Sequence, residues 1–215
     1  MVRLALEGVG KVYGAHRVLG GLDLALDGGD LLVLRGASGA GKTTLLQIAG
    51  LLEPPSEGRV ILDGEDVAAL DDDARARVRL ARIGHVFQTH NMIPSLTLLD
   101  NVLLPMRLAR RADAGRARAL LADVGLAGKT ASYPDEVSIG ERQRAAFARA
   151  LANEPDVLLA DEPTASLDDA NATLVTDLLE AAQARGCAVL VASHDGRVKG
   201  ADIPLISGGS APRHP

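Results

Sequence analysis

A glycine-rich segment near the start of the chain has the residue types needed to hold a triphosphate. Its spacing is G-x-x-x-x-G-K-[ST], which is typical of a phosphate-binding loop between a strand and a helix. The residues are Gly36, Ala37, Ser38, Gly39, Ala40, Gly41, Lys42, Thr43 and Thr44. Backbone N–H groups of such a loop surround the phosphates, Lys42 would bridge the β- and γ-phosphates, and the Thr43 hydroxyl would bind Mg²⁺. A plain glycine-rich turn would not require the closing Lys-Thr pair, so we predict a nucleoside triphosphate site with Mg²⁺.

Two acids stand at the end of a later apolar run. The run 157–160 reads as a buried strand, and Asp161 and Glu162 follow it. Because ligands of a parallel sheet gather at the carboxyl ends of its strands, we expect Asp161 to face the same crevice as Lys42. Asp161 could hold Mg²⁺, and Glu162 could orient the attacking water as a base. A strand that ends in acids is not specific by itself, but it becomes so beside a phosphate-binding loop.

Two further strand ends carry polar residues that could reach the same crevice. Gln88 follows the apolar run 83–87, and His194 follows the run 189–192. A lone histidine is more often structural than catalytic, and an isolated glutamine at a strand end carries no signal. The position beside the crevice favours a functional reading of His194, as a hydrogen-bonding partner of a γ-phosphate oxygen.

Ser138 begins a sequence that is typical of a capped helix. Ser138 and Glu141 have the spacing of a capping box, and a helix is predicted over 142–152. One interpretation is a well-capped surface helix. The other is an anion site, because an exposed helix N-terminus attracts negative charge. Since Ser138 falls in a helical insertion away from Lys42, we expect it to face a nucleotide on a second copy, which would make ATP the link of a head-to-tail dimer.

Strands that alternate with helices must position these residues. The predicted strands cover 2–14, 17–26, 31–34, 59–64, 83–87, 157–161 and 187–192, of which the first two are antiparallel. The predicted helices cover 43–49, 113–124, 142–152 and 170–184, and another starts at Thr97 and is kinked or ended by Pro105. The order predicts an α/β fold, a P-loop NTPase core with a mainly parallel sheet, an N-terminal antiparallel β subdomain and an inserted α-helical subdomain.

Composition limits the classes of protein that fit. The chain has 215 residues, 47% of them hydrophobic but only 2% aromatic, and a net charge of −5. A single domain is expected, with 1–88 and 153–207 forming the core, 89–152 the helical subdomain and 208–215 a disordered tail. The acidic balance disfavours nucleic acid as a partner. The sequence has no apolar run long enough to span a bilayer, no signal-peptide pattern and one cysteine, Cys187, which together indicate the reducing cytosol.

Taken in order, these motifs resemble the nucleotide-binding domain of ATP-binding cassette (ABC) transporters across nearly the whole chain. The matching positions are Tyr13 for the adenine-stacking aromatic, Gly36–Thr44 for Walker A, Gln88 for the Q-loop, Val137–Arg144 for the signature, Asp161 and Glu162 for Walker B and the catalytic glutamate, Ser166–Asp168 for the D-loop, and His194 for the switch histidine. The resemblance implies catalytic roles for Glu162, His194 and Gln88, and Mg²⁺ ligands in Thr43, Gln88 and Asp161.

The resemblance also implies cofactors, partners and location. ATP and Mg²⁺ would be bound, and Ser138, Gly140 and Asp168 would contact the nucleotide of a second ABC subunit, in a homodimer that forms on ATP binding. An integral-membrane permease would be the other partner, and the chain would lie in the cytoplasm, peripheral to the inner face of the cell membrane. The segment 88–105 resembles the branch of lipoprotein release, macrolide export and cell division.

One residue departs from the family signature. Ile139 stands where the family has glycine, and it would be strained if that position requires a positive φ, but tolerated if it is the first residue of a helix. Three functions therefore remain open. They are the motor of a transporter, an ATP-dependent switch on a membrane or cell-wall partner, and a soluble ATPase of DNA repair or translation. The last is disfavoured because neither a coiled-coil insertion nor a tandem cassette is present.

Overall fold

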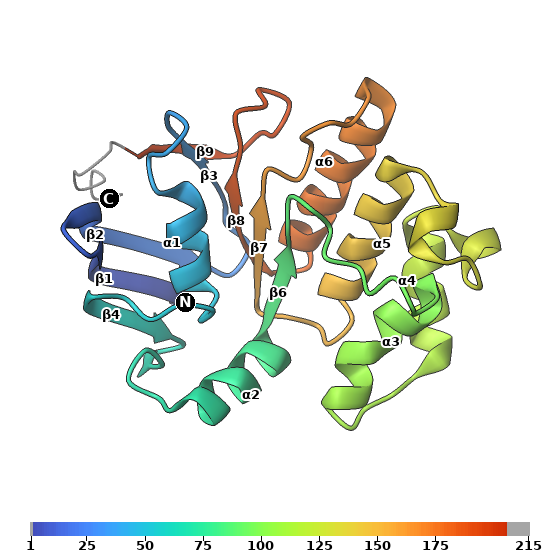
Figure 1. Cartoon of the computed structure of the whole chain (residues 1–215), viewed down its shortest axis with the longest axis horizontal. Helices are drawn as coiled ribbons and strands as arrows, with labels where there is room; N and C mark the ends of the chain where they lie inside the picture. The colour runs from blue at the N-terminus through green and yellow to red at the C-terminus, as the bar shows by residue number, and fades with distance from the viewer. Residues whose placement is uncertain (1, 206–215) are drawn as a thin grey trace.

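The computed structural model describes residues 2–205 and contains two β-sheets with flanking helices (Figure 1). The strands are β1 (Val2–Tyr13), β2 (His16–Asp27), β3 (Leu31–Arg35), β4 (Glu57–Leu62), β5 (Glu65–Asp66), β6 (Ile83–Val86), β7 (Val157–Asp161), β8 (Ala188–Ala192) and β9 (Ala201–Pro204). The α-helices are α1 (Lys42–Ala49), α2 (Asp72–Arg82), α3 (Leu98–Leu108), α4 (Ala114–Asp123), α5 (Ile139–Ala150) and α6 (Asp169–Ala184), and 3₁₀ turns occupy Ala127–Lys129 and Pro134–Glu136. The tail predicted to be disordered lies outside the described residues.

The central sheet is parallel and buried on both faces. Its strand order is β6-β7-β8-β3-β9, and each neighbouring pair runs parallel. Because side chains alternate along a strand, β8 sends Leu190 into one core and Val189 and Val191 into the other. The second core also contains Phe147 of α5 and residues of α6. This arrangement aligns the carboxyl ends of β6, β7, β8 and β3 along one edge, which is uppermost in Figure 1.

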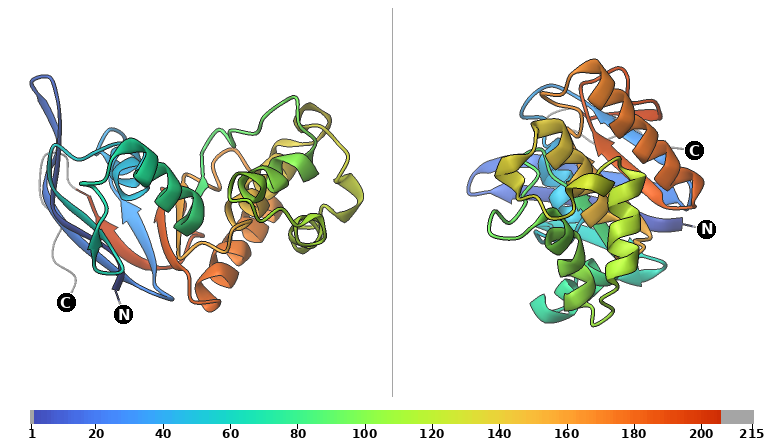
Figure 2. Two further views of the ribbon diagram at one scale, coloured as in Figure 1. Left: turned by 90° about the horizontal axis from the view of Figure 1, so that it is seen from below. Right: turned by 90° about the vertical axis from the view of Figure 1, so that its right-hand side faces the viewer.

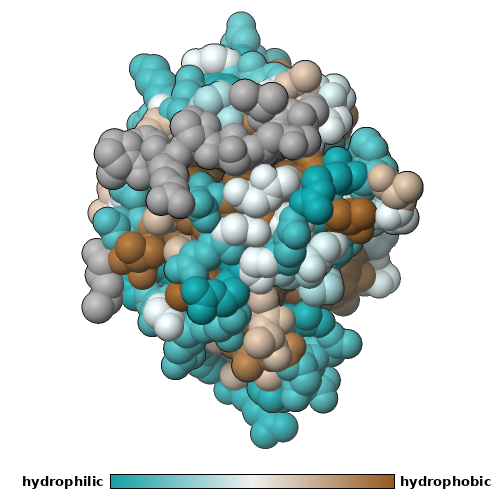
Figure 3. Space-filling model, turned by 90° about the vertical axis from the view of Figure 1, so that its left-hand side faces the viewer, coloured by the Kyte–Doolittle hydropathy of each residue, from teal (hydrophilic) through white to brown (hydrophobic). Residues whose placement is uncertain are grey.

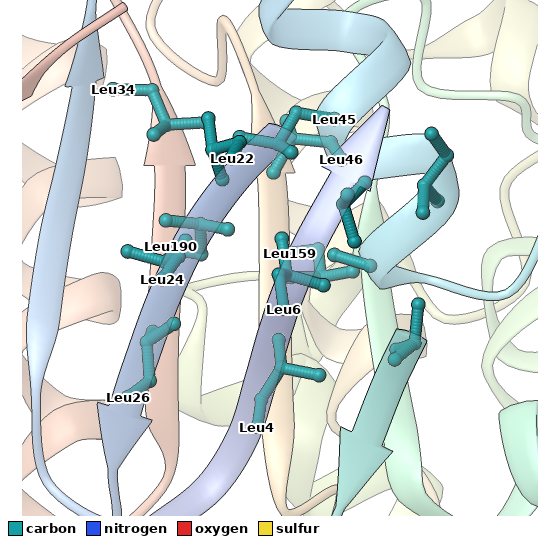
Figure 4. Close-up of a cluster of buried hydrophobic side chains, with 14 of the residues drawn as sticks. Leu4, Leu6, Leu22, Leu24, Leu26, Leu34, Leu45, Leu46, Leu159 and Leu190 are labelled. Carbon is teal, nitrogen blue, oxygen red and sulfur yellow. The ribbon is translucent and has the colours of Figure 1, made fainter. Parts of the chain in front are cut away.

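The N-terminal sheet is antiparallel and packs across α1. Its order is β2-β1-β4-β5, and its inward side chains share a core with α1 and one face of the central sheet. Figure 4 shows Leu4, Leu6 and Leu24 of this sheet facing Leu159 and Leu190 of the central sheet. Leucine supplies most of the bulk, as expected from the low aromatic content. Helix α1 is therefore held between two sheets, which fixes the phosphate-binding loop at its N-terminus.

The helices α3, α4 and α5 form a block with its own apolar cluster. Leu98, Met106, Leu121 and Ala145 are members of that cluster. Figure 2 shows the block on the opposite side of the central sheet from the antiparallel sheet. Helix α5 belongs to both regions, because its Phe147 packs under the central sheet while its Ala145 packs against α3 and α4.

The structure contains elements that the sequence did not predict, and one helix continues past the proline that was expected to kink or end it. Helix α3 continues through Pro105 to Leu108, because burial of Met106 holds its last turn, and Asn153 donates to the Pro105 carbonyl at 3.1 Å. Helix α2 was not predicted, since none of its residues is fully buried and charged residues dominate its sequence. Strand β9 was also missed, because its Asp202 and Pro204 are poor strand formers that are tolerated at a sheet edge.

Helix α5 begins three residues earlier than predicted, directly after Ser138. Ser138 is the N-cap, and the predicted capping box with Glu141 is present. Ile139 is therefore the first helical residue, and it is not among the described residues with positive φ. Of the two possibilities left open by the sequence, the structure has the unstrained one.

The outer face of the molecule is mostly polar where the antiparallel sheet lies. Figure 3 shows this side with hydrophilic residues predominating and hydrophobic ones scattered among them. Across residues 2–205, no helix has both the length and the apolar character required to traverse a membrane.

Candidate functional site

The predicted phosphate-binding loop opens into a cavity of about 490 Å³ at the carboxyl edge of the central sheet. Its lining comprises Val18, Ser38, Gly39, Gly41, Lys42, Thr43, Thr44, Gln88, Asp161, Glu162, Ala165 and His194. Residues from β2, α1 and the ends of β6, β7 and β8 thus meet in one place, although they are scattered along the chain. Among the described residues, the other predicted contacts lie outside this lining, namely Tyr13, Gly36, Ala40, Ser138, Gly140 and Asp168.

The backbone of the loop depends on glycine at Gly41. Gly41 is the N-cap of α1 with φ of 93°, a left-handed conformation that other residues rarely adopt. A Cβ added there would also approach Leu19 Cδ2 to 2.9 Å and Val18 Cγ1 to 3.0 Å. Having no side chain, Gly41 cannot cap the helix, so the first N–H groups of α1 point toward the cavity as donors.

Lys42 and His194 are in contact inside the cavity. Lys42 is only 7% exposed, and its Nζ donates to the Gly36 and Ala37 carbonyls at 2.8 and 3.2 Å. Its Nζ also lies 3.0 Å from Nε2 of His194. Because an ammonium group can only donate, Lys42 is the donor in this contact. The cationic amine and the imidazole are therefore positioned to contact the same phosphate group.

Glu162 faces His194 from the neighbouring strand end. Its Oε1 lies 3.5 Å from His194 Nε2, and its Oε2 accepts from the His194 backbone N–H at 3.3 Å. Glu162 has φ of 44°, while its own N–H donates to the Ala192 carbonyl at 2.8 Å. A left-handed conformation at a non-glycine residue costs about 1–3 kcal/mol and is concentrated at functional sites.

Thr43, Gln88 and Asp161 supply a set of oxygen donors that fits Mg²⁺. Burial raises the pKa of the Asp161 carboxyl, and the hydrogen bond from Thr43 and the charge of Lys42 oppose the rise. The Thr43 hydroxyl and the Asp161 carboxylate therefore lie side by side, and the Gln88 amide lines the same cavity. Hard oxygen ligands of this kind are those that Mg²⁺ prefers.

Tyr13 lies at the edge of the site and is 44% exposed. It ends β1, and its hydroxyl donates to Glu53 Oε2 at 2.6 Å, an interaction that raises the Tyr13 pKa. A hydrogen bond with Thr44 ties the same hydroxyl to the first turn of α1. The ring thus stands next to the phosphate-binding loop, partly exposed, with Lys11 Nζ over it at 5.1 Å from its centroid.

The signature residues form a separate group at the start of α5. Gly140 is buried against α6, and a Cβ added to it would meet Asn171 Cγ at 2.5 Å. Asn171 in turn donates through Nδ2 to both carboxylate oxygens of Asp168 at 2.9 Å. Asp168 also caps α6 by accepting from the Asn171 backbone N–H at 2.8 Å. The structure therefore links Asp168 to Gly140, and leaves Ser138 and Ile139 exposed.

Sequence reasoning missed two residues that line the cavity. Val18 comes from β2, and Ala165 follows the acids at the end of β7. Neither has a side chain that could do chemistry, so only the spatial arrangement reveals them. Val18 belongs to the antiparallel sheet, whereas the acids follow a strand of the central sheet. Its Cγ1 would lie 3.0 Å from a Cβ added at Gly41, so β2 passes close to the loop.

Comparison with known proteins agrees with this geometry. A protein-family profile described as "ABC transporter" matches residues 19–165. The lipoprotein-releasing system ATP-binding protein LolD 2 of Caulobacter vibrioides is 44% identical over 200 residues, which cover 89% of this chain and 88% of the relative. LolD of Ruegeria pomeroyi is 46% identical over 202 residues, with coverage of 89% and 88%.

Solved structures lead to the same fold. The ATP-binding cassette MJ0796, described as a dimeric post-hydrolysis state bound to ADP and Pi, superposes with a TM-score of 0.91. The identity is 36%, and the superposition covers 98% of this chain and 97% of that chain. The α/β fold predicted from the sequence is thereby confirmed. With a family profile over most of its length and relatives above 40% identity, the chain belongs to the ABC transporter family and is an ATP-hydrolysing cassette of that family.

Proposed function

We propose that this cassette hydrolyses ATP in the cavity between the phosphate-binding loop and the ends of β6, β7 and β8. The observation that carries the proposal is the convergence of Lys42, Glu162 and His194, with Nζ–Nε2 and Nε2–Oε1 distances of 3.0 and 3.5 Å. Glu162 orients a water for in-line attack on the γ-phosphate, and Lys42 and His194 stabilise the charge that develops there.

The loop and its neighbours also bind the rest of the nucleotide. Backbone N–H groups over 36–41, including those of Ser38, Gly39 and Ala40, hold the phosphates, and Tyr13 stacks on the adenine. Thr43, Asp161 and Gln88 hold Mg²⁺, which neutralises phosphate charge when bound. Gln88 has a second role, because it lines the cavity and also follows β6 at the junction with the helical block. A change in nucleotide contacts at Gln88 would therefore shift the helical block.

Two copies of the chain would share each nucleotide. Ser138 is exposed and Gly140 packs against α6 at the start of α5, and both lie outside the cavity of their own chain. We propose that they contact the γ-phosphate bound by a second, identical chain, with Asp168 alongside through Asn171. The description of the 36% identical cassette MJ0796 as dimeric supports this arrangement. Hydrolysis then removes the contact that joins the chains, and the dimer opens.

A membrane permease would convert that opening into transport. A groove of about 660 Å³ lies between the central sheet and α3, and its lining includes Phe87, Asn91, Leu104 and Leu108. We propose that a cytoplasmic helix of the permease docks here, which would place the cassette at the inner face of the cell membrane. Leu108 is 64% exposed at the groove, so Leu108→Glu should abolish stimulation of hydrolysis by the permease and leave basal hydrolysis unchanged. Leu174→Glu, at a leucine 46% exposed on α6, is the matched control.

The permease selects what is transported. Relatives at 44% and 46% identity are named as parts of lipoprotein-releasing systems, so we propose a permease that acts on lipoproteins. The same names give no support to the alternative of a regulatory switch without transport. Co-purification of the chain with its permease from membranes, followed by release assays with lipid-modified and unmodified substrate proteins, tests this choice.

The role of Glu162 has a direct test in the purified chain. Glu162→Gln keeps the size of the side chain and removes the carboxylate, so ATP should still bind while steady-state hydrolysis falls by about 100-fold or more. Glu180→Gln, on α6 outside the cavity, serves as the control and should hydrolyse ATP at the parental rate. Parental hydrolysis by Glu162→Gln would contradict the role given to this carboxylate.

A further inference from the structure

Arg35 occupies the last position of β3, directly before the phosphate-binding loop, and its guanidinium donates hydrogen bonds from all three nitrogens. Its Nη1 donates to the Ser193 and Asp195 carbonyls at 3.0 and 2.8 Å. Its Nη2 donates to the Val198 carbonyl at 2.8 Å, and its Nε donates to Asp202 Oδ1 at 3.0 Å. The guanidinium therefore binds a segment far away in sequence, between β8 and β9.

The Ser193 and Asp195 carbonyls lie on either side of His194. Hydrogen bonds to both carbonyls restrict the backbone dihedrals before and after this residue. The segment has no strand or helix of its own over 193–200, so no ladder of backbone hydrogen bonds fixes it. The Ser193 N–H donates to the Leu34 carbonyl at 3.3 Å, and the His194 N–H donates to Glu162 Oε2 at 3.3 Å. Within the segment, the Val198 N–H donates to the Asp195 carbonyl at 3.3 Å. Arg35 is thus the side chain that connects the base of the loop to both flanks of His194.

The imidazole needs such support because it is not held by packing. The His194 side chain is 55% exposed, yet its Nε2 lies 3.0 Å from Lys42 Nζ and 3.5 Å from Glu162 Oε1. An exposed ring keeps a defined position only if its backbone is held firmly. We infer that Arg35 is a positioning residue for His194, and this inference rests on the proposed role of His194 in hydrolysis.

Arginine suits this role better than other residues. The planar guanidinium presents several N–H donors in fixed directions, so one group can bind three carbonyls at once. A lysine could donate to only some of these carbonyls, because all its N–H donors lie on one nitrogen at the end of a flexible side chain. An apolar residue would leave carbonyls in a partly buried position without donors.

A double-mutant cycle tests the inference. The four proteins are the parent, Arg35→Met, His194→Ala and the double variant, each measured for kcat and KM for ATP and for its thermal unfolding midpoint. We expect His194→Ala to lower kcat by about 100-fold or more. Arg35→Met should lower kcat by about 10- to 100-fold with little change in KM, because a small misplacement of a catalytic group has an effect of this size. The double variant should have the kcat of His194→Ala, because Arg35 acts only through the imidazole.

Other outcomes separate this inference from the proposed function. If His194→Ala lowers kcat while Arg35→Met retains the parental value, or if the two losses multiply in the double variant, Arg35 does not act through His194. If His194→Ala itself hydrolyses at the parental rate, the role of the histidine and the inference both fail. Arg35→Lys, which keeps the charge and one donor site, should give an intermediate kcat, and it replaces Arg35→Met in the cycle if that variant does not fold. Asp202→Asn is the control, because Asp202 contacts only Nε and is 62% exposed, and it should keep the parental kcat.

Discussion

Two helix N-termini face the proposed nucleotide positions, and they are built in opposite ways. Helix α1 begins after Gly41, which has no side chain to cap it, and its first turn contains no acid. Helix α5 begins after Ser138, whose Oγ accepts from the Glu141 N–H at 3.2 Å, while Glu141 Oε2 accepts from the Ser138 N–H at 3.0 Å. Lys129 further holds the Glu141 carboxylate at 2.6 Å.

The difference separates a site that is complete in one chain from one that needs a second chain. The uncapped start of α1 leaves N–H donors for phosphates. The same cavity is lined by the Lys42 ammonium group, the carboxylates of Asp161 and Glu162, and His194. The capping box of α5 pairs the N–H groups of Ser138 and Glu141, so this helix start is stable without a ligand. Ser138 is exposed and can exchange one of its hydrogen bonds for a phosphate oxygen of a bound nucleotide. In the proposed arrangement, the first region binds ATP and the second region contacts the ATP bound by a partner chain.

The largest effect is expected in the first region. Lys42→Ala removes the amine that contacts His194, and it should lower hydrolysis by about 100- to 1,000-fold, since losing one preorganised charge donor has an effect of this size. Steady-state phosphate release measures it. Lys199→Ala, at an exposed lysine outside the cavity, is the matched control and should match the parent. Hydrolysis by Lys42→Ala within a factor of a few of the parent would contradict the assignment of the cavity.

Gly140→Ala tests the packing of the second region. Its Cβ would meet Asn171 Cγ at 2.5 Å, so the Asn171 side chain must move away from Asp168 and Arg144, and the free energy of unfolding should fall by about 1–3 kcal/mol. Gly128→Ala is the control, because no described atom lies within 4 Å of its added Cβ, and it should change stability by less than about 0.5 kcal/mol. Urea unfolding compares the two, and equal stabilities would show that Gly140 is not required by packing.

Neutralising one carboxylate in each region should change the free energy of unfolding in opposite directions. Burial raises the pKa of Asp161 above 3.8, so folding disfavours its charge, and this destabilisation grows as pH rises through the folded-state pKa. The hydrogen bond from Lys129 holds the pKa of Glu141 below 4.5, so its stabilisation is present above pH 4.5 and is lost as pH falls through the folded-state pKa.

At neutral pH, Asp161→Asn should therefore raise the free energy of unfolding by about 0.5–2 kcal/mol while hydrolysis is lost. Glu141→Gln should lower the free energy of unfolding by about 1 kcal/mol, as a weakened helix cap does. Urea unfolding between pH 4 and pH 7 measures both, and both differences should shrink toward the acid end. Destabilisation by Asp161→Asn would mean that the Lys42 charge, rather than burial, dominates at that carboxyl.

The smallest effect concerns Ile139. Because it is the first residue of α5 and 46% exposed, Ile139→Gly should leave the rate of ATP hydrolysis within about twofold and lower stability by about 0.5–1 kcal/mol. Steady-state hydrolysis by the two purified proteins decides the matter. An inactive parent beside an active Ile139→Gly variant would show that the altered signature disables the shared site, and would favour an ATP-binding switch.

Local patterns were sufficient to predict much of the molecule. The spacing of glycines before Lys42 predicted the loop, and apolar runs ending in polar residues predicted the edge where Gln88, Asp161 and His194 meet. These features are local because they depend on backbone conformation and on the alternation of strands and helices. The capping box likewise predicted Ser138 as the N-cap.

Features that depend on distant partners could not be predicted in this way. Arg35 reads as the end of an apolar strand, and nothing near it in sequence indicates that it binds carbonyls around His194. Helix α2 is stabilised by its cap at Asp71, by charges at its ends and by the packing of Val78, a partly buried residue, against the core, and its few apolar residues gave too weak a pattern to predict it. Strand β9 exists because β3 offers it a free edge.

The division of the site between two chains is tested most directly by dimer formation. In the presence of ATP and Mg²⁺, Glu162→Gln should form a dimer in analytical ultracentrifugation, because ATP binds but is not hydrolysed. Adding Ser138→Phe, which blocks the exposed start of α5, should leave a monomer that binds ATP with unchanged affinity. A doubly substituted chain that still dimerises, or one that no longer binds ATP, would contradict a second region that acts only on the nucleotide of its partner.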